Sequence, residues 1–197
     1  MRKSVLIVIA MCIFGTTLHA QSPLTLYAGG LASIPSSPSS FTDYFKNGYH
    51  GMVGLGMKSL PYFQFVFKVE YHEFKSDPKN FTGFRTVTRG LWLYGIDGRL
   101  AIGIPAAPIK PFILAGIGLA RVTSTDLVEL VGSGLVPDEL KKAAAINQDR
   151  LYLNIGGGIE LKFLPMISLF AQARIVKVST RGESTEFIPI TLGIKFF

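Results

Sequence analysis

The segment FQFVFKVEYH, residues 63–72, decides the fold class of this chain. Every odd-numbered position is apolar or aromatic, whereas all but one of the even-numbered positions carry a polar side chain. A period of two is that of a β-strand, whose successive side chains point to opposite faces, and an amphipathic helix would repeat every three or four residues instead. The segment therefore predicts a strand with one apolar and one polar face. The two sets are Phe63, Phe65, Phe67, Val69 and Tyr71, and Gln64, Val66, Lys68, Glu70 and His72.

The composition places this strand in a membrane. The chain of 197 residues is 48% hydrophobic and 17% charged, with a mean hydropathy of +0.37 and 21 glycines, whereas soluble domains average about 25% charged residues. A membrane helix needs roughly 18 or more consecutive apolar residues, and the unbroken apolar run from Val5 to Gly15 is shorter than that. The 15 phenylalanines and 7 tyrosines exclude disorder, and the single cysteine excludes a disulfide scaffold. A transmembrane β-barrel, which spreads its apolar residues over alternating positions, fits these observations.

Seven further segments complete a set of eight predicted strands. Three of them alternate as clearly as residues 63–72, and the other four more weakly. In residues 24–34 and 112–123, glycine and alanine dilute the alternation, so the faces of these two strands stay unassigned. The clear segments are 89–102, 151–163 and 188–196, and the weaker ones are 24–34, 49–59, 112–123 and 167–178.

The connections between these strands alternate in length. Proline-marked short turns follow the second, fourth and sixth strands, whereas longer polar links follow the first, third, fifth and seventh. Short periplasmic turns and long outer loops are typical of outer-membrane barrels, and an even number of strands leaves both termini on the periplasmic side. We therefore expect an all-β, eight-stranded, up-and-down antiparallel barrel. The short turns are 59–61, 105–110 and 164–165, and the long links are 35–46, 76–84, 124–150 and 180–186.

The first 20 residues have the layout of a secretory signal peptide. Arg2 and Lys3 precede the apolar stretch 5–14, and a short polar stretch ends at Ala20. We expect cleavage after Ala20, which leaves residues 21–197 as the barrel domain. The alternative is a lipoprotein cleavage box that would lipidate Cys12. With cleavage after Ala20 the mature chain has no cysteine, which removes disulfides and thiolate metal sites.

Three segments in the second half of the chain carry a family resemblance. They are KPFILAGIGLAR (110–121), YLNIGGGIELK (152–162) with its proline turn and following strand, and ITLGIKFF (190–197). Together they resemble the small opacity-type and OmpA-type outer-membrane β-barrels, often labelled porin-family. The resemblance implies a location in the outer membrane of a Gram-negative bacterium and insertion by the barrel-assembly machinery through the C-terminal strand. It implies little about activity, since members include adhesins, evasion factors, structural anchors and weak pores.

Many charged side chains fall on the lumenal face of the predicted strands. The lumen of an eight-stranded barrel is just wide enough for side chains to fill it, and a buried charge needs a partner. We expect these residues to interlock as a plug, although their excess of bases leaves a narrow anion-preferring pore as the alternative. The bases are Lys58, Lys68, Arg89, Arg99, Lys162, Arg174 and Lys195, and the acids are Glu70, Asp97 and Glu160.

Two histidines form a predicted polar pair near the outer rim. A turn around Pro61 that pairs Lys58 with Gln64 sets His50 opposite His72, with Glu70 two residues away. A metal site needs three or four ligands, and a catalytic serine needs a base with an orienting acid. Since no serine is forced beside the pair, we interpret these histidines as polar rim residues and expect neither an enzyme nor a metal or other cofactor.

The long links supply the candidate contact residues. The link 124–150 contains a predicted short helix at 137–146 and, ahead of it, apolar residues that either close the barrel mouth as a lid or meet a partner. The first link is rich in serine and proline and carries aromatic residues at its tip. We expect aromatic girdles at Tyr49, Phe63, Tyr71, Trp92 and Tyr152. The loop contact candidates are Phe41, Tyr44, Phe45, Leu127, Leu130 and Leu135.

The basic residues near the outer rim favour lipid over nucleic acid. No clustered basic stretch with interleaved aromatics is present, and export argues against nucleic acid. We expect Arg85, Arg89, Arg121 and Arg150 to meet phosphates of lipopolysaccharide. The sequence thus predicts a non-enzymatic outer-membrane barrel with a structural or adhesion-like role through its loops. The alternative hypothesis is a narrow anion-preferring pore, and the third is a lipid-modifying enzyme.

Overall fold

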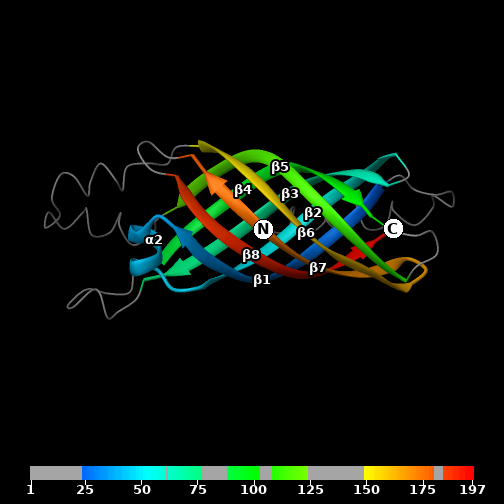
Figure 1. Ribbon diagram of the computed structural model, residues 1–197, viewed down its shortest axis with the longest axis horizontal. Coiled ribbons are helices and arrows are strands. Elements are labelled where there is room, and N and C mark those ends of the chain that lie inside the picture. The colour runs from blue at the N-terminus through cyan, green and yellow to red at the C-terminus, as the bar shows by residue number, and fades with distance from the viewer. Residues whose placement is uncertain (1–23, 61, 77–87, 103–107, 124–148, 180–183) are drawn as a thin grey trace, which may run out of the picture.

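The computed structural model describes residues 24–60, 62–76, 88–102, 108–123, 149–179 and 184–197. Eight strands form a closed barrel in the order β1 to β8, in which every neighbouring pair is antiparallel and β1 pairs with β8 (Figure 1). In the described part of the chain, no helix has the length and hydropathy to cross a bilayer. The elements are β1 (Leu24–Ser37), α2 (Ser39–Tyr44), β2 (Gly48–Leu60), β3 (Phe63–Lys75), β4 (Thr88–Ala101), β5 (Ile109–Thr123), β6 (Asp149–Leu164), β7 (Ile167–Val178) and β8 (Thr185–Phe196).

The predicted fold class, strand number and meander order are confirmed, and the strand ends differ by a few residues. Strand β1 continues past Ile34 to Ser37, with a register shift between Pro35 and Ser37. Proline lacks the N–H that a ladder needs, which explains an irregularity at that point. The expected pairing of Lys58 with Gln64 is present in the register of β2 and β3. The predicted signal peptide, residues 1–20, lies outside the described residues.

The outer surface of the barrel is an apolar belt. The outward positions of the strands expose large hydrophobic side chains to an unusual degree, for example Val53 at 60% and Ile155 at 64%. Such a surface is stable in lipid and would be costly in water. Four of the five expected girdle residues lie on this outward face, whereas the prediction for Tyr152 is wrong. Its side chain is fully buried, because position 152 shares the inward parity of Asn154.

Strand β1 breaks the strict alternation. Thr25, Tyr27 and Ser33 are buried, but Leu31 is 48% exposed although the register sets it beside the buried His50 and Thr191. The faces that the sequence left unassigned in this strand are therefore irregular over residues 29–32.

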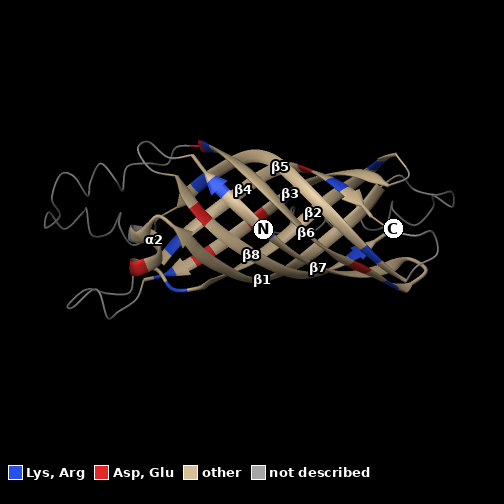
Figure 2. Ribbon diagram, viewed as in Figure 1, with Lys and Arg blue, Asp and Glu red and all other residues tan. Residues whose placement is uncertain are grey.

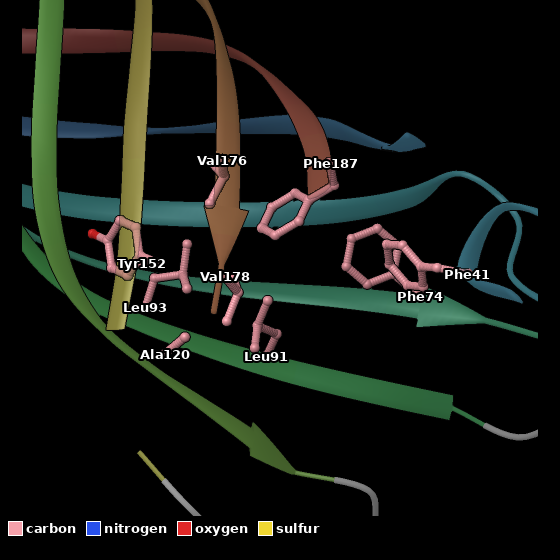
Figure 3. Packing of buried hydrophobic residues seen from close by; sticks show 9 residues of the cluster. All are labelled: Phe41, Phe74, Leu91, Leu93, Ala120, Tyr152, Val176, Val178 and Phe187. Carbon is pink, nitrogen blue, oxygen red and sulfur yellow. The ribbon is translucent and has the colours of Figure 1, made fainter. Parts of the chain in front are cut away.

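The lumen is filled by side chains whose polarity changes along the barrel axis. Its half toward the long connections holds an apolar cluster, into which α2 inserts Phe41 (Figure 3). The Phe41 ring meets Phe74 edge to face at 5.1 Å between centroids, and Phe74 meets Phe187 at 5.6 Å. The first connection therefore closes this end of the barrel with an aromatic plug. The cluster comprises Phe41, Phe74, Leu91, Leu93, Ala120, Tyr152, Val176, Val178 and Phe187.

Glycines make room for the largest of these side chains. Gly118 pairs with Tyr152 across β5 and β6, and Gly95 pairs with Gly118 across β4 and β5. A Cβ atom at Gly95 would collide with the Tyr152 hydroxyl and with the carbonyl oxygen of Ile117. The tyrosine can lie flat across two neighbouring strands only because both positions lack a side chain.

We expect Gly95→Ala to destabilise the barrel by about 1–3 kcal/mol, the usual cost of overpacking a filled interior. The matched control is Gly51→Ala, because a Cβ atom at Gly51 would meet nothing within 4 Å. Urea unfolding in detergent, followed by the fluorescence of the single tryptophan Trp92, measures both. Equal midpoints for the two variants would contradict the packing described.

Candidate functional site

The middle of the lumen holds a closed ion-pair network built from three strands. The Glu70 carboxylate on β3 forms ion pairs with the Arg174 guanidinium on β7 at 2.8 Å and with the Lys68 ammonium at 3.3 Å. Lys68 reaches across to Asp97 on β4 at 2.7 Å, and Asp97 also accepts a hydrogen bond from Asn154 at 2.9 Å. Two bases thus face two carboxylates.

These charges are out of reach of solvent. The side chains of Lys68, Glu70 and Arg174 are fully buried, and that of Asp97 is 6% exposed. Figure 2 shows the charged positions spread over several strands rather than gathered on one. Charges removed from water are stable only when they are paired with good geometry. The network is therefore neutral in sum and acts as a polar plug.

A second cluster lies nearer the short turns and is positively charged. Glu160 on β6 pairs with the Arg99 guanidinium at 2.7 Å and with the Lys195 ammonium at 3.1 Å. The guanidinium also lies 3.5 Å from the ring centroid of Phe112 and 5.4 Å from that of Tyr27. One carboxylate serves two bases here, so the cluster keeps an excess positive charge.

Three of the predicted lumenal bases form no ion pair with the described residues of either cluster, although Lys58 shares the Phe197 ring with Lys195. Lys58 and Lys162 are exposed at strand ends near the short turns. Arg89 lies over the rings of Phe41 and Phe45 at 5.4 Å and 5.9 Å from their centroids. The expectation of a single interlocked set is therefore wrong for these three, because parity gives the face of a residue but not its depth.

The two histidines meet as the register predicts, but the expectation of rim residues is wrong, because both are buried in the lumen at 5% and 0% exposure. His50 pairs with His72 across β2 and β3, and their rings stack at 4.8 Å between centroids. Ser33 on β1 joins them, with its hydroxyl 3.1 Å from His50 Nδ1 and 2.8 Å from His72 Nδ1. This serine is not among the predicted site residues, because it lies in the strand whose alternation is diluted.

When both imidazoles are neutral, the partners of this group allow one arrangement of protons. Glu70 can only accept, so His72 donates from Nε2 to the carboxylate at 3.2 Å and accepts the Ser33 hydroxyl at Nδ1. Ser33 then accepts from His50 Nδ1, and His50 Nε2 accepts the Thr191 hydroxyl at 3.0 Å. Every group in the chain is satisfied with both imidazoles neutral. These bonds link β8, β1, β2 and β3.

Ser33, His72 and Glu70 have the composition of a hydrolytic triad, but the group is sealed. Ser33 and His72 are both 0% exposed, and the Phe187 ring packs edge-on against His72 at 4.9 Å. A nucleophile needs access to its substrate, and Glu70 is already engaged by Lys68 and Arg174. Among the described residues no group of three or more histidine, cysteine or acidic side chains has a metal-binding arrangement.

The loop candidates divide into three groups. Phe41 is buried in the aromatic plug at 4% exposure, so its expected role as a contact tip is wrong, and Phe45 is half-buried beside it. Tyr44 is exposed at 44%. Leu127, Leu130 and Leu135 lie outside the described residues, as does the predicted helix 137–146.

We expect Glu70→Gln to lower the stability of the barrel by about 3–5 kcal/mol, because it leaves buried bases without their shared partner. Glu73→Gln is the control, since Glu73 lies on the same strand with outward parity. Urea unfolding followed by Trp92 fluorescence measures both variants. Equal stability of the two would show that the network contributes nothing.

The comparisons with known proteins concern the fold. No family model and no curated protein matches the chain. Neisserial surface protein A is similar over 89% of this chain and 97% of its own, with a TM-score of 0.62 and 14% identity. The N-terminal β-barrel domain of Pseudomonas aeruginosa OprF has a TM-score of 0.49 and 14% identity over 89% of this chain and 98% of its own. For Ail, the attachment invasion locus protein of Yersinia pestis, the TM-score is 0.46 and the identity 12% over 88% of this chain and 97% of its own. The likeness to Neisserial surface protein A shows the barrel fold.

Proposed function

We propose that this protein is a non-enzymatic barrel of the bacterial outer membrane that binds a partner outside the cell through its long connections. The apolar belt and the predicted signal peptide support this location. The segments 110–121, 152–162 and 190–197 support membership of the opacity-type and OmpA-type group, whose members are inserted through their C-terminal strand. The proposal that the loops bind a partner depends mainly on whether side chains close the lumen.

The observation that carries the proposal is that the lumen is occupied at three levels. Near the short turns, the Arg99 guanidinium lies on the Phe112 ring. The middle holds the fully buried network around Glu70, and toward the long connections the apolar cluster lies under Phe41. A conducting path needs a continuous wetted lumen. The described residues therefore favour a scaffold over the alternative of a narrow anion-preferring pore.

The first connection is fixed on the barrel in a way that suits presentation. Phe41 anchors α2 inside the mouth, which leaves Tyr44 on the outside at 44% exposure. Arg89 lies over Phe41 and Phe45, so β4 also contacts this connection. Loops held by a rigid scaffold are where binding residues concentrate. The sequence of the third connection contains the apolar residues Leu127, Leu130 and Leu135, and we propose a binding role for it as well.

The other proposed contacts are with lipid. Arg121 and Asp149 form an exposed ion pair at 2.9 Å at the long-connection end, on the rim where lipopolysaccharide phosphates would lie. A lipid-modifying enzyme is disfavoured, because the triad-like group found among the described residues is enclosed in the lumen. No feature of the described residues favours nucleic acid.

Deletion of residues 126–148 tests the role of the loops. We expect the truncated barrel to keep its heat-dependent gel mobility, because the segment lies between β5 and β6, and to lose adherence conferred on a laboratory Gram-negative host. Adherence to cultured epithelial cells and to immobilised matrix proteins is counted against the host with empty vector, with Val53→Ala on the lipid face as the control. Unchanged adherence after the deletion, or none conferred by the full chain, would contradict the proposal.

Planar-bilayer recordings test the closed lumen. We expect the refolded full chain to give no conductance steps in symmetric salt, because the buried network around Glu70 and the apolar cluster under Phe41 interrupt the path. The variants Lys68→Ala and Arg99→Ala serve as the reference for a charge-lined path. Steps that favour anions in the full chain and change in these variants would support the pore and overturn the scaffold.

A further inference from the structure

The short-turn mouth of the barrel contains a cavity that the loop proposal does not use. Its volume is about 110 Å³, which is enough for several water molecules. Six strands and the turn at Tyr62 contribute to its wall, so it lies inside the barrel rather than on the lipid face. The lining residues are Lys58, Tyr62, Phe63, Gln64, Arg99, Ala101, Lys110, Phe112, Glu160, Lys195 and Phe197.

The charge of this cavity is strongly positive. Four of the described lining residues are basic, and Glu160 is the one acid among them. Arg99 and Lys195 are buried, at 6% and 5% exposure, and both already share Glu160. Lys58 and Lys110 are exposed at the entrance. The field inside a low-dielectric wall therefore attracts an anion and disfavours a cation.

The bases are held in place by aromatic rings rather than by further acids. The Arg99 guanidinium lies over Phe112, and the Lys195 and Lys58 ammonium groups lie 4.5 Å and 5.6 Å from the ring centroid of Phe197. Contact with a ring orients a cation but does not neutralise it. The donors of these groups consequently remain suited to hydrogen bonds with an oxyanion.

The buried side of the cavity adjoins a second apolar cluster, which the lining residues Arg99 and Gln64 contact. The cluster is made of Tyr27, Met52, Val66 and Phe170. The Arg99 guanidinium lies 5.4 Å and 5.9 Å from the ring centroids of Tyr27 and Phe170, and the Tyr27 hydroxyl donates to Gln64 at 2.7 Å. A ligand therefore enters and leaves at the short-turn end, which faces the periplasm in a barrel of this topology.

We propose that this cavity binds a phosphate-type oxyanion from the periplasmic side. Arg99 and Lys195 contact the anion from within, and Lys58 and Lys110 close around it at the entrance. The same chemistry is offered by free inorganic phosphate and by the phosphate headgroup of an anionic phospholipid in the inner leaflet. The site is separate from the long connections and independent of the loop function.

Calorimetric titration of the refolded full chain with inorganic phosphate, in phosphatidylcholine nanodiscs at constant ionic strength, tests this site. We expect saturable binding that Lys58→Gln/Lys110→Gln weakens by about tenfold, because each exposed pair contributes modestly. The control is Lys75→Gln/Lys162→Gln, which removes the same charge from exposed lysines that do not line the cavity. Gel mobility with and without boiling verifies that both variants fold.

A second arm distinguishes the two sources of phosphate. The ¹⁵N-arginine side-chain spectrum is compared in phosphatidylcholine and phosphatidylglycerol nanodiscs without phosphate, and the Arg99 signal is identified by its loss in Arg99→Lys. A shift of that signal with phosphatidylglycerol, and no further response to phosphate, assigns the site to a lipid headgroup. A response to phosphate alone assigns it to the free anion. No response in either arm, or equal phosphate affinity of the two lysine variants, overturns the proposal.

Discussion

The pairing of β1 with β8 is the constraint on which the rest of the structure depends. Lipid offers no hydrogen bonds to a sheet edge, so a membrane sheet must close on itself. Eight strands close around a lumen that has room for side chains and little else. The narrow lumen explains why glycines at 95 and 118 lie beneath Tyr152. It also explains why the charges that point inward meet one another.

Closure also divides the lumen into zones with different electrostatic character. Toward the long connections the filling is apolar, and around Glu70 two bases meet two carboxylates. Near the short turns, Glu160 is shared by Arg99 and Lys195, which leaves positive charge in excess. Part of the surplus of basic residues in the sequence therefore lies at the short-turn mouth of the barrel. A neutral middle and a plugged outer end separate that charge from the loops, so the two ends of the barrel can carry unrelated interactions.

Local periodicity explains what the sequence could predict. Alternation in residues 63–72 depends only on neighbours along one strand, and the short connection between β2 and β3 then determines the register that brings His50 opposite His72. The position of Ser33 beside the histidines could not be predicted in the same way, because Ser33 lies in β1, whose alternation is diluted. The prediction for Phe41 is wrong because no periodic pattern indicates whether the side chain of an aromatic loop residue points inward or outward. Parity also says nothing about the depth of a residue along the barrel, and the prediction therefore groups the exposed Lys162 with buried bases.

The polar group at Ser33 has a role that follows from the weakness of β1. Where one face is buried, the hydrophobic pattern specifies register, and a shift by one residue would turn every side chain to the wrong face. Over residues 29–32 that pattern is missing, and Leu31 is exposed beside inward-facing neighbours. Ser33 bonds to both histidines, and His50 bonds to Thr191 on the closing strand. A shift of β1 by one residue would break both hydrogen bonds of Ser33 and leave buried donors and acceptors unpaired, at a cost of about 1–3 kcal/mol each. Directional hydrogen bonds therefore specify the register of β1 where hydrophobic alternation does not.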